Sequence, residues 1–224
     1  ALPISSFYPE AGENVLTDIS FKAKKGQTIA VIGSTGSGKS TLINLIPRYY
    51  DVTKGSVKVD GVDVRDMTQK ELRDKLGYVP QKGVLFSGTI DSNIRYGKPE
   101  ITDAQVKEAA EVAQATEFID TKPEKYESPV SQGGTNVSGG QKQRLSIARA
   151  IAKDPEIFIF DDSFSALDFK TDSQLRKALK EYTKDATTVI VAQRISTILG
   201  ADQIIVLDDG HMAGIGTHKE LMAN

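Results

Sequence analysis

The chain has 224 residues, enough for one large domain or two small ones, and a net charge of −2 with acidic and basic residues interspersed. It has no cysteine and only two histidines, His211 and His218, which excludes disulfide or thiolate chemistry and argues against a histidine-based metal site. The charge pattern argues against nucleic-acid binding, and no apolar run approaches the roughly 20 residues that cross a bilayer, so any membrane role requires a partner.

Strand-like and helical segments alternate along the chain, which predicts an α/β fold with a largely parallel sheet. Residues 27–33 (QTIAVIG) form a predicted buried strand that leads into a glycine-rich turn. A helix follows over KSTLINLIPRYY, and Pro47 is expected to end or kink it. Residues 55–66 predict a hairpin, because valines alternate on both sides of an Asp-Gly turn.

The middle of the chain reads as helical. Residues 102–118 are alanine-rich with helical spacing and begin with a threonine cap, and a second helix begins near Gly140. Together they predict a helical insertion of roughly 65 residues between strands of the α/β core. Beyond it, residues 156–160 and 187–192 predict central strands that are apolar on both faces. Residues 203–218 predict a last strand and a second Asp-Gly hairpin.

The glycine-rich turn carries the first chemical motif. Its sequence GSTGSGKST fits G-x-x-x-x-G-K-[ST], and it follows a strand and opens a helix, which is the context that confirms a phosphate loop. The backbone can wrap phosphates with its N–H groups pointing inward, Lys39 can reach the β- and γ-phosphates, and Ser40 can ligate Mg²⁺. The predicted nucleotide-binding residues here are Gly33, Ser34, Thr35, Gly36, Ser37, Gly38, Lys39, Ser40 and Thr41.

A second motif, IFIFDD, supplies the expected partner of the phosphate loop. Four apolar residues deliver Asp161 at the end of a buried strand, where its carboxylate can hold Mg²⁺ through water. Apolar residues followed by aspartates are common, so the motif is weak alone. Paired with the phosphate loop, it becomes a strong signal.

A third motif, NVSGGQKQRLSIARA, identifies the family. Ser138, Gly139, Gly140 and Gln141 open a helix with bare N–H groups and a hydroxyl, which makes a second anion site. One chain rarely carries two such sites so far apart for one nucleotide. The combination resembles the nucleotide-binding domain of ABC transporters over essentially all 224 residues. In that family two domains pack head to tail, and each ATP lies between one phosphate loop and the other domain's SGGQ helix.

The resemblance implies roles for further residues. Tyr8 occupies the position of the aromatic that stacks on adenine, and Gln81 matches the glutamine that touches Mg²⁺ and hinges the helical insert. Residues 165–168 (SALD) match the loop that crosses the dimer interface, and residues 85–97 resemble exporters more than importers. The implied metal ligands are thus Ser40, Gln81 and Asp161, with ATP and Mg²⁺ as cofactors.

The implied fold is a RecA-like P-loop NTPase core with an antiparallel β-subdomain and an inserted α-helical subdomain. The whole chain, residues 1–224, would be one ABC nucleotide-binding domain. Its ATPase core would comprise residues about 1–82 and 151–224, and its helical subdomain residues about 83–150.

Two positions depart from the family pattern at the implied catalytic residues. Asp162 stands where most members have the glutamate that polarises the attacking water, and an error of about 1 Å can cost on the order of 100-fold. Gln193 stands where most have a histidine, and it cannot carry a proton or a charge. Gln132 replaces a common glutamate, whereas Val137 is a mild change in a nearly intact signature. The chain therefore resembles the degenerate half of a heterodimeric exporter, whose signature completes the partner's site.

Other interpretations stay open. The chain can be a competent homodimeric exporter domain in which Asp162 and Gln193 are tolerated or engineered. A soluble ABC ATPase acting on ribosomes or DNA ends usually carries tandem domains or a long coiled coil, and the chain has neither. A nucleotide kinase or GTPase has no use for VSGGQ.

The resemblance also implies partners and location. They are a second nucleotide-binding domain and transmembrane domains, which would dock through coupling helices on residues around 81–95. The start at ALPISSFY is consistent with a domain cut from a longer chain. The expected location is the cytoplasmic face of the cell membrane, within an integral transporter. The isolated domain is expected to be soluble.

Overall fold

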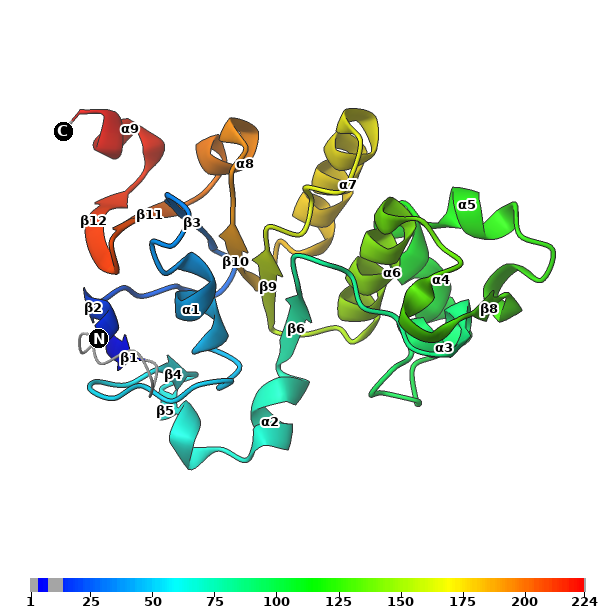
Figure 1. Ribbon diagram of the computed structural model, residues 1–224, viewed down its shortest axis with the longest axis horizontal. Helices are drawn as coiled ribbons and strands as arrows, with labels where there is room; N and C mark the ends of the chain where they lie inside the picture. The colour runs from blue at the N-terminus through cyan, green and yellow to red at the C-terminus, as the bar shows by residue number, and fades with distance from the viewer. Residues whose placement is uncertain (1–3, 8–13, 224) are drawn as a thin grey trace. The chain divides into compact units, whose positions relative to one another are not determined.

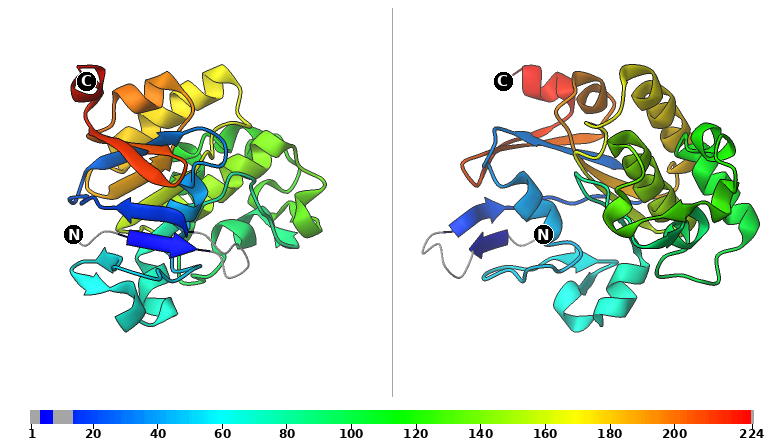
Figure 2. Two further views of the ribbon diagram at one scale, coloured as in Figure 1. Left: turned by 60° about the vertical axis from the view of Figure 1, so that its left-hand side comes forward. Right: turned by 45° about the vertical axis from the view of Figure 1, so that its right-hand side comes forward.

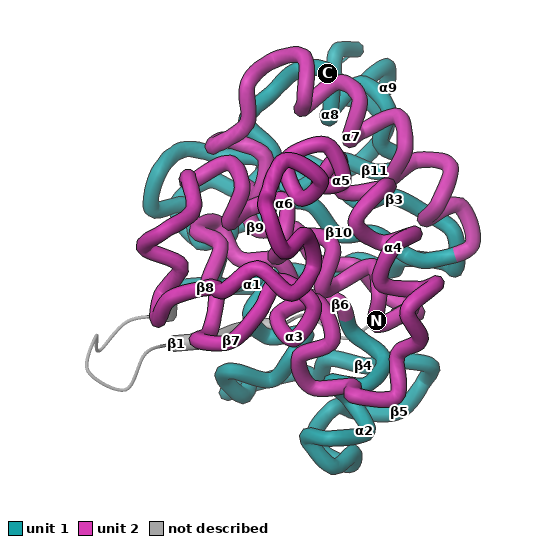
Figure 3. The backbone as a smooth tube through the Cα atoms, turned by 90° about the vertical axis from the view of Figure 1, so that its right-hand side faces the viewer, with its two compact units in different colours: residues 1–76, 186–224 teal, residues 77–185 magenta. Residues whose placement is uncertain are grey.

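The computed structural model (Figure 1) describes residues 4–7 and 14–223, which fall into two compact units (Figure 3). Unit 1 combines the residues up to 76 with those from 186 onward, and unit 2 comprises residues 77–185. Tyr8 lies outside the described residues. Among the described residues, no helix is both long and apolar enough to cross a membrane.

Unit 1 is built on a mixed sheet with the strand order β1-β2-β12-β11-β3-β10. Figure 2 gives two further views of the ribbon, with these strands in blue and in orange to red. At its centre β3 pairs in parallel with β10 and β11, so Val31 lies opposite both Val191 and Ile205. The predicted α/β fold is confirmed, and the pairing on both sides of β3 is parallel, whereas β1 with β2 and β11 with β12 pair antiparallel. The strands are β1 Ile4–Phe7, β2 Asn14–Ile19, β3 Thr28–Gly33, β10 Thr187–Val191, β11 Gln203–Asp208 and β12 His211–Gly216.

The central strands are apolar because both of their faces are covered. Ile29, Ala30 and Val31 of β3 are fully buried, and Val189 and Ile190 of β10 nearly so. Helix α1, Lys39–Asn44, packs against β2, β3 and β10 and ends before Pro47, as predicted. The other helices of unit 1 are α2 Gln69–Asp74, α8 Ile195–Leu199 and α9 His218–Met222, with a 3₁₀ turn η1 at Val64–Asp66.

Both predicted Asp-Gly hairpins are confirmed. Asp60 and Gly61, with φ of 51° and 79°, join β4 (Lys58–Val59) to β5 (Val62–Asp63). Asp209 and Gly210, with φ of 43° and 75°, join β11 to β12. Positive φ at both central residues is the geometry that favours aspartate followed by glycine. The first hairpin is short, since each of its strands has two residues.

In unit 2, β6 (Leu76–Val79) lies beside β9 (Ile157–Asp161). Helix α6, Gly139–Ala152, packs against α3 and α4, and its start agrees with the prediction near Gly140. The other elements of this unit are α3 Ile90–Ile94, α4 Asp103–Val112, α5 Thr116–Asp120, α7 Phe169–Tyr182, the pair β7 Gly88–Thr89 and β8 Pro129–Val130, and the 3₁₀ turns η2 Lys125–Glu127 and η3 Gln132–Gly134.

The single helix predicted over residues 102–118 is wrong. Thr102 caps α4 as expected, but the helix ends at Val112, and α5 starts anew at Thr116. The break occurs at Gln114, whose φ is 58°. The freed carbonyl of Gln114 accepts a hydrogen bond from Arg144 Nη1 at 2.7 Å, so a tertiary contact stabilises the break against local propensity.

Candidate functional site

The phosphate loop leaves β3 and enters α1 through backbone that only glycine fits. A β-carbon at Gly33 would lie 2.3 Å from the backbone oxygen of Leu207, and one at Gly38 would lie 2.5 Å from Leu16 Cδ2. Gly36 and Gly38 also have φ of 81° and 99°, which L side chains rarely adopt. Backbone that alternates between right- and left-handed conformations, or turns sharply, can direct successive N–H groups toward a common centre, which suits an anion.

The Lys39 side chain folds back onto the start of the phosphate loop. Its Nζ donates to the backbone oxygens of Gly33 and Ser34, both at 2.7 Å. The ammonium is therefore held above the loop by two carbonyl groups. A cation fixed at this place can exchange a carbonyl contact for a phosphate oxygen.

Ser37 provides a test of whether the loop fits a phosphate group. The residue is 2% exposed, and its Oγ finds no hydrogen-bond partner among the described residues. Its backbone is satisfied, because its N–H donates to Ser34 and its carbonyl accepts from Gly210, both at 3.1 Å. A buried hydroxyl without a partner beside a glycine cradle fits a loop built for a polar ligand. Ser34, Thr35 and Ser40 are exposed around it, and Thr41 is buried in α1.

Gln193 belongs to the same edge of the unit 1 sheet as the phosphate loop. It lies two residues beyond Val191, and Gly33 lies two residues beyond Val31, its partner on the parallel neighbour β3. The carboxyl ends of parallel strands meet at one edge, where open α/β sheets place their ligands. The Gln193 residue is exposed at this edge.

The two aspartates of IFIFDD lie in unit 2. Asp161 is the last residue of β9, and both aspartates are half-buried. Asp162 has a φ of 48°, a left-handed conformation that aspartate tolerates better than most residues. The Oγ of Ser165 donates to its carbonyl oxygen at 3.2 Å, which helps to hold the turn.

Gln81 follows β6 by two residues and points its amide toward the second aspartate. Its Nε2 lies 3.5 Å from Asp162 Oδ2, at the outer limit of a hydrogen bond. Since β6 and β9 are neighbours, unit 2 brings Gln81 together with the carboxylate pair.

The start of α6 is capped by its own side chains. Ser138 Oγ accepts from the N–H of Gln141 at 3.2 Å, and Gln141 Oε1 accepts from the N–H of Ser138 at the same distance. This reciprocal box leaves the N–H groups of Gly139 and Gly140 as the open donors of the first turn. A β-carbon at Gly139 would have nothing within 4 Å, whereas one at Gly140 would lie 3.4 Å from the backbone oxygen of Ala166.

A charged side chain, Asp168, ends the loop of residues 165–168, and it interacts electrostatically with Arg144 of α6. Asp168 caps α7, and its pKa lies below the usual value because Thr171 donates to it from both its hydroxyl and its backbone N–H. Arg144 stacks 4.7 Å from the ring centre of Phe118, and burial lowers its pKa. The capping carboxylate is thus held in its charged form.

The predicted site residues fall into two groups. Unit 1 has the phosphate loop and Gln193 at one edge of its sheet, and unit 2 has Gln81 beside Asp162 and also contains Asp161 and the start of α6. Sequence reasoning missed two buried polar residues beside them, Ser163 and Gln143. No local signal marked either residue, because Gln143 lies between Lys142 and Arg144 and Ser163 directly follows Asp162.

The comparisons with known proteins agree with these motifs. The model of the ABC transporter family matches residues 16–165. The chain is 48% identical over 219 residues to the putative multidrug export ATP-binding/permease protein YgaD of Bacillus subtilis, covering 98% of this chain and 38% of that protein. It is 50% identical to the uncharacterized ABC transporter ATP-binding protein Rv1273c of Mycobacterium tuberculosis, over 97% of this chain and 38% of the relative.

A solved structure is similar over nearly the whole chain. The structure of a bacterial Atm1-family ABC exporter with ATP bound superposes with a TM-score of 0.93 at 37% identity, covering 99% of this chain and 40% of that one. The chain thus spans about two fifths of the length of the proteins it matches.

Proposed function

This chain belongs to the ABC transporter family as an ATP-binding domain, and from that premise we propose that it binds Mg·ATP to drive export by membrane-spanning partners. The phosphate loop carries the proposal, because Lys39 and the buried hydroxyl of Ser37 border a glycine cradle. Ser40, Gln81 and Asp161 would supply oxygen ligands to Mg²⁺, and Tyr8 would stack on adenine. When bound, Mg²⁺ would neutralise charge on the phosphates.

We further propose that hydrolysis at this chain's own phosphate loop is slow. Asp162 offers a carboxylate one methylene shorter than the usual glutamate, and the Gln81 amide faces it. Gln193 offers an amide where an imidazole is usual and cannot move a proton. These two departures would leave the chain able to hold ATP but poor at activating water.

The start of α6 is proposed to serve a partner's nucleotide. Gly139 and Gly140 keep open N–H groups, and the Ser138 hydroxyl accepts one hydrogen bond while its own proton stays available to a phosphate oxygen. The partner is a second ABC nucleotide-binding domain. In the proposed division, residues about 1–82 and 151–224 form the ATPase core and residues about 83–150 the helical subdomain that carries this helix.

Mixing experiments test this division of roles. ATPase activity of the chain mixed with a homologous domain that carries the glutamate and histidine should far exceed the activity of either alone. The alternative hypothesis is a catalytically competent homodimer. The double variant Asp162→Glu with Gln193→His distinguishes it from the proposed heterodimer. A large rate gain without a partner favours the alternative hypothesis, and strong turnover by the unmodified chain alone contradicts the proposal.

Residues around 81–95 are proposed to receive the coupling helices of transmembrane domains, at the cytoplasmic face of the membrane. Phe86 and Tyr96 are exposed, and their rings stack with centroids 4.2 Å apart. Beneath them Arg149 lies 5.3 Å and 5.6 Å from the two ring centres, and burial lowers its pKa to about 10. The apolar surface above this cation suits an apolar helix.

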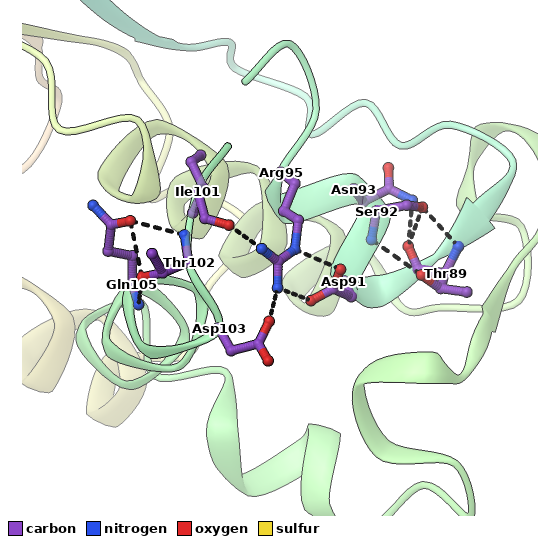
Figure 4. Close-up of polar contacts among 9 residues, drawn as sticks. All are labelled: Thr89, Asp91, Ser92, Asn93, Arg95, Ile101, Thr102, Asp103 and Gln105. Atoms are coloured by element: carbon purple, nitrogen blue, oxygen red, sulfur yellow. Dashed lines mark hydrogen bonds and ion pairs between the residues drawn. The ribbon is translucent and has the colours of Figure 1, made fainter. Parts of the chain in front are cut away.

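Arg95 fixes the far end of this face. Figure 4 shows its guanidinium between Asp91, within α3, and Asp103, at the start of α4, where it also contacts the carbonyl of Ile101.

Cross-linking from position 86 to a coupling helix tests the docking. Leu85 is 1% exposed and cannot serve as the attachment point. Contacts found only elsewhere would contradict this part of the proposal.

A further inference from the structure

The chain between β6 and the helical segment of unit 2 is anchored by two buried side chains at consecutive carbonyl groups. The oxygen of Val79, the last residue of β6, accepts from Ser163 Oγ at 2.7 Å. The next oxygen, that of Pro80, accepts from Gln143 Nε2 at 3.0 Å. Ser163 is fully buried, and Gln143 is 1% exposed. Breaking either contact would leave a buried polar group unsatisfied, which costs more than the bond contributes.

A third contact follows at Gly83. A β-carbon there would lie 2.8 Å from the carbonyl carbon and oxygen of Lys142 and 3.0 Å from the nitrogen of Gln143. Any side chain would therefore collide with the backbone of α6. Gly83 allows the segment to touch the helix that begins at the SGGQ motif.

Gln81 directly follows the two hydrogen-bonded carbonyl groups, precedes Gly83 by two residues and is itself exposed. The first donor, Ser163, directly follows Asp162, whose carboxylate Gln81 approaches. The second donor, Gln143, lies two residues beyond Gln141 of the α6 cap. The backbone that carries Gln81 is thus tied to the carboxylate loop and to α6 at once.

We propose that Ser163 and Gln143 are positioning residues that fix Gln81 for Mg²⁺, holding it in register with Asp161 and with the start of α6. This inference rests on the proposed function, since it takes Gln81 as a Mg²⁺ ligand. Groups that orient metal ligands from behind change metal affinity on the order of 10- to 100-fold when removed.

The test is a double-mutant cycle on the full chain. ATP binding is followed by displacement of a fluorescent ATP analogue while Mg²⁺ is titrated. Gln143→Met keeps the shape of the side chain and removes the donor, and Ser163→Ala removes the hydroxyl. Each should raise the Mg²⁺ concentration for half-maximal binding about tenfold. In a Gln81→Ala background neither should have a further effect, because residues that act through one another are not additive.

Ser146→Ala is the matched control. Ser146 is buried on the same helix, and its Oγ has no partner among the described residues, so its loss should leave the Mg²⁺ dependence unchanged. Ser163→Thr, which keeps a hydroxyl, should recover most of the affinity that Ser163→Ala loses. Ser163→Ala also keeps the test informative where Gln143→Met does not fold.

Two outcomes overturn the inference and separate it from the proposed function. Shifts that are as large in the Gln81→Ala background as in the unmodified chain would show a merely structural role. A Ser146→Ala shift of similar size would show the same. Absence of any Mg²⁺-dependent ATP binding by the unmodified chain would instead overturn the proposed function and the inference with it.

Discussion

The phosphate loop before α1 and the start of α6 differ in how the first N–H groups of each helix are capped. Gly38 precedes α1 with a φ of 99°, and it makes no side-chain capping hydrogen bond. Ser138 precedes α6 in an extended conformation, and its capping box with Gln141 satisfies the N–H groups of both of these residues. The start of α1 therefore lacks a side-chain cap, and a bound phosphate could take its place. The start of α6 is already capped by its own side chains, so a phosphate there would add to existing hydrogen bonds, which suits a contact that forms only when a partner binds.

The largest expected effect falls on the glycine cradle. Gly33→Ala forces a β-carbon to within 2.3 Å of the Leu207 backbone oxygen, so the strands or the loop must shift. We expect a loss of about 3 kcal/mol in the free energy of unfolding, together with loss of ATP binding. Gly36→Ala is the control, because nothing lies within 4 Å of its β-carbon and only its φ of 81° costs about 1 kcal/mol. Equal losses in urea denaturation would contradict a cradle set by close approach.

Lys39→Met should reduce ATP affinity about 10- to 100-fold, because charge-assisted hydrogen bonds contribute about 1.5–3 kcal/mol. Stability should change little, since the two carbonyl groups that Lys39 contacts are exposed. Isothermal titration calorimetry measures the affinity. Lys25→Met, at an exposed lysine of the same unit, should leave it unchanged. An unchanged ATP affinity in Lys39→Met would show that Lys39 does not contribute to ATP binding.

Ser138→Ala separates the two roles of the α6 cap. Loss of the capping hydroxyl should cost about 1 kcal/mol of stability. It should also slow ATP turnover by a complex with a competent partner, while ATP binding by the isolated chain stays unchanged. Thr68→Ala removes the cap of an equivalent box at α2, with Glu71 as the reciprocal partner. Thr68→Ala should lower stability by the same amount as Ser138→Ala and leave ATP turnover unchanged. If both variants slow ATP turnover equally, Ser138 acts only as a helix cap.

The smallest effect concerns the charged cap of α7. Because its folded pKa is lowered, the Asp168 carboxylate stabilises the fold above the usual aspartate pKa, and this contribution is lost as the pH falls through the lowered value. Asp168→Asn keeps a capping oxygen and cannot titrate. The difference in unfolding free energy between the two chains should therefore shrink on acidification from pH 5 to pH 3, and a constant difference would contradict it.

Local chemistry determined what the sequence could predict. The phosphate loop and both Asp-Gly hairpins are set by residues next to one another, and the structure has them as expected. The break at Gln114 and the anchors of Gln81 depend on partners 30 to 84 residues away, which no local pattern indicates. The roles of Tyr8, Asp162 and Gln193 came from the family resemblance and stay predictions.

Arg149 has a consequence for anyone who alters the aromatic surface above it. Its guanidinium donates to the oxygens of Val84 and Asn93 and lies beneath both rings. We expect that truncating Phe86 or Tyr96 would remove a ring contact from this guanidinium and weaken its hold on the two carbonyl groups. A variant of this kind that fails to assemble with its membrane partner could therefore have lost affinity for the partner, stability of its own fold, or both. Thermal denaturation of the isolated domain, measured in parallel, distinguishes the two causes.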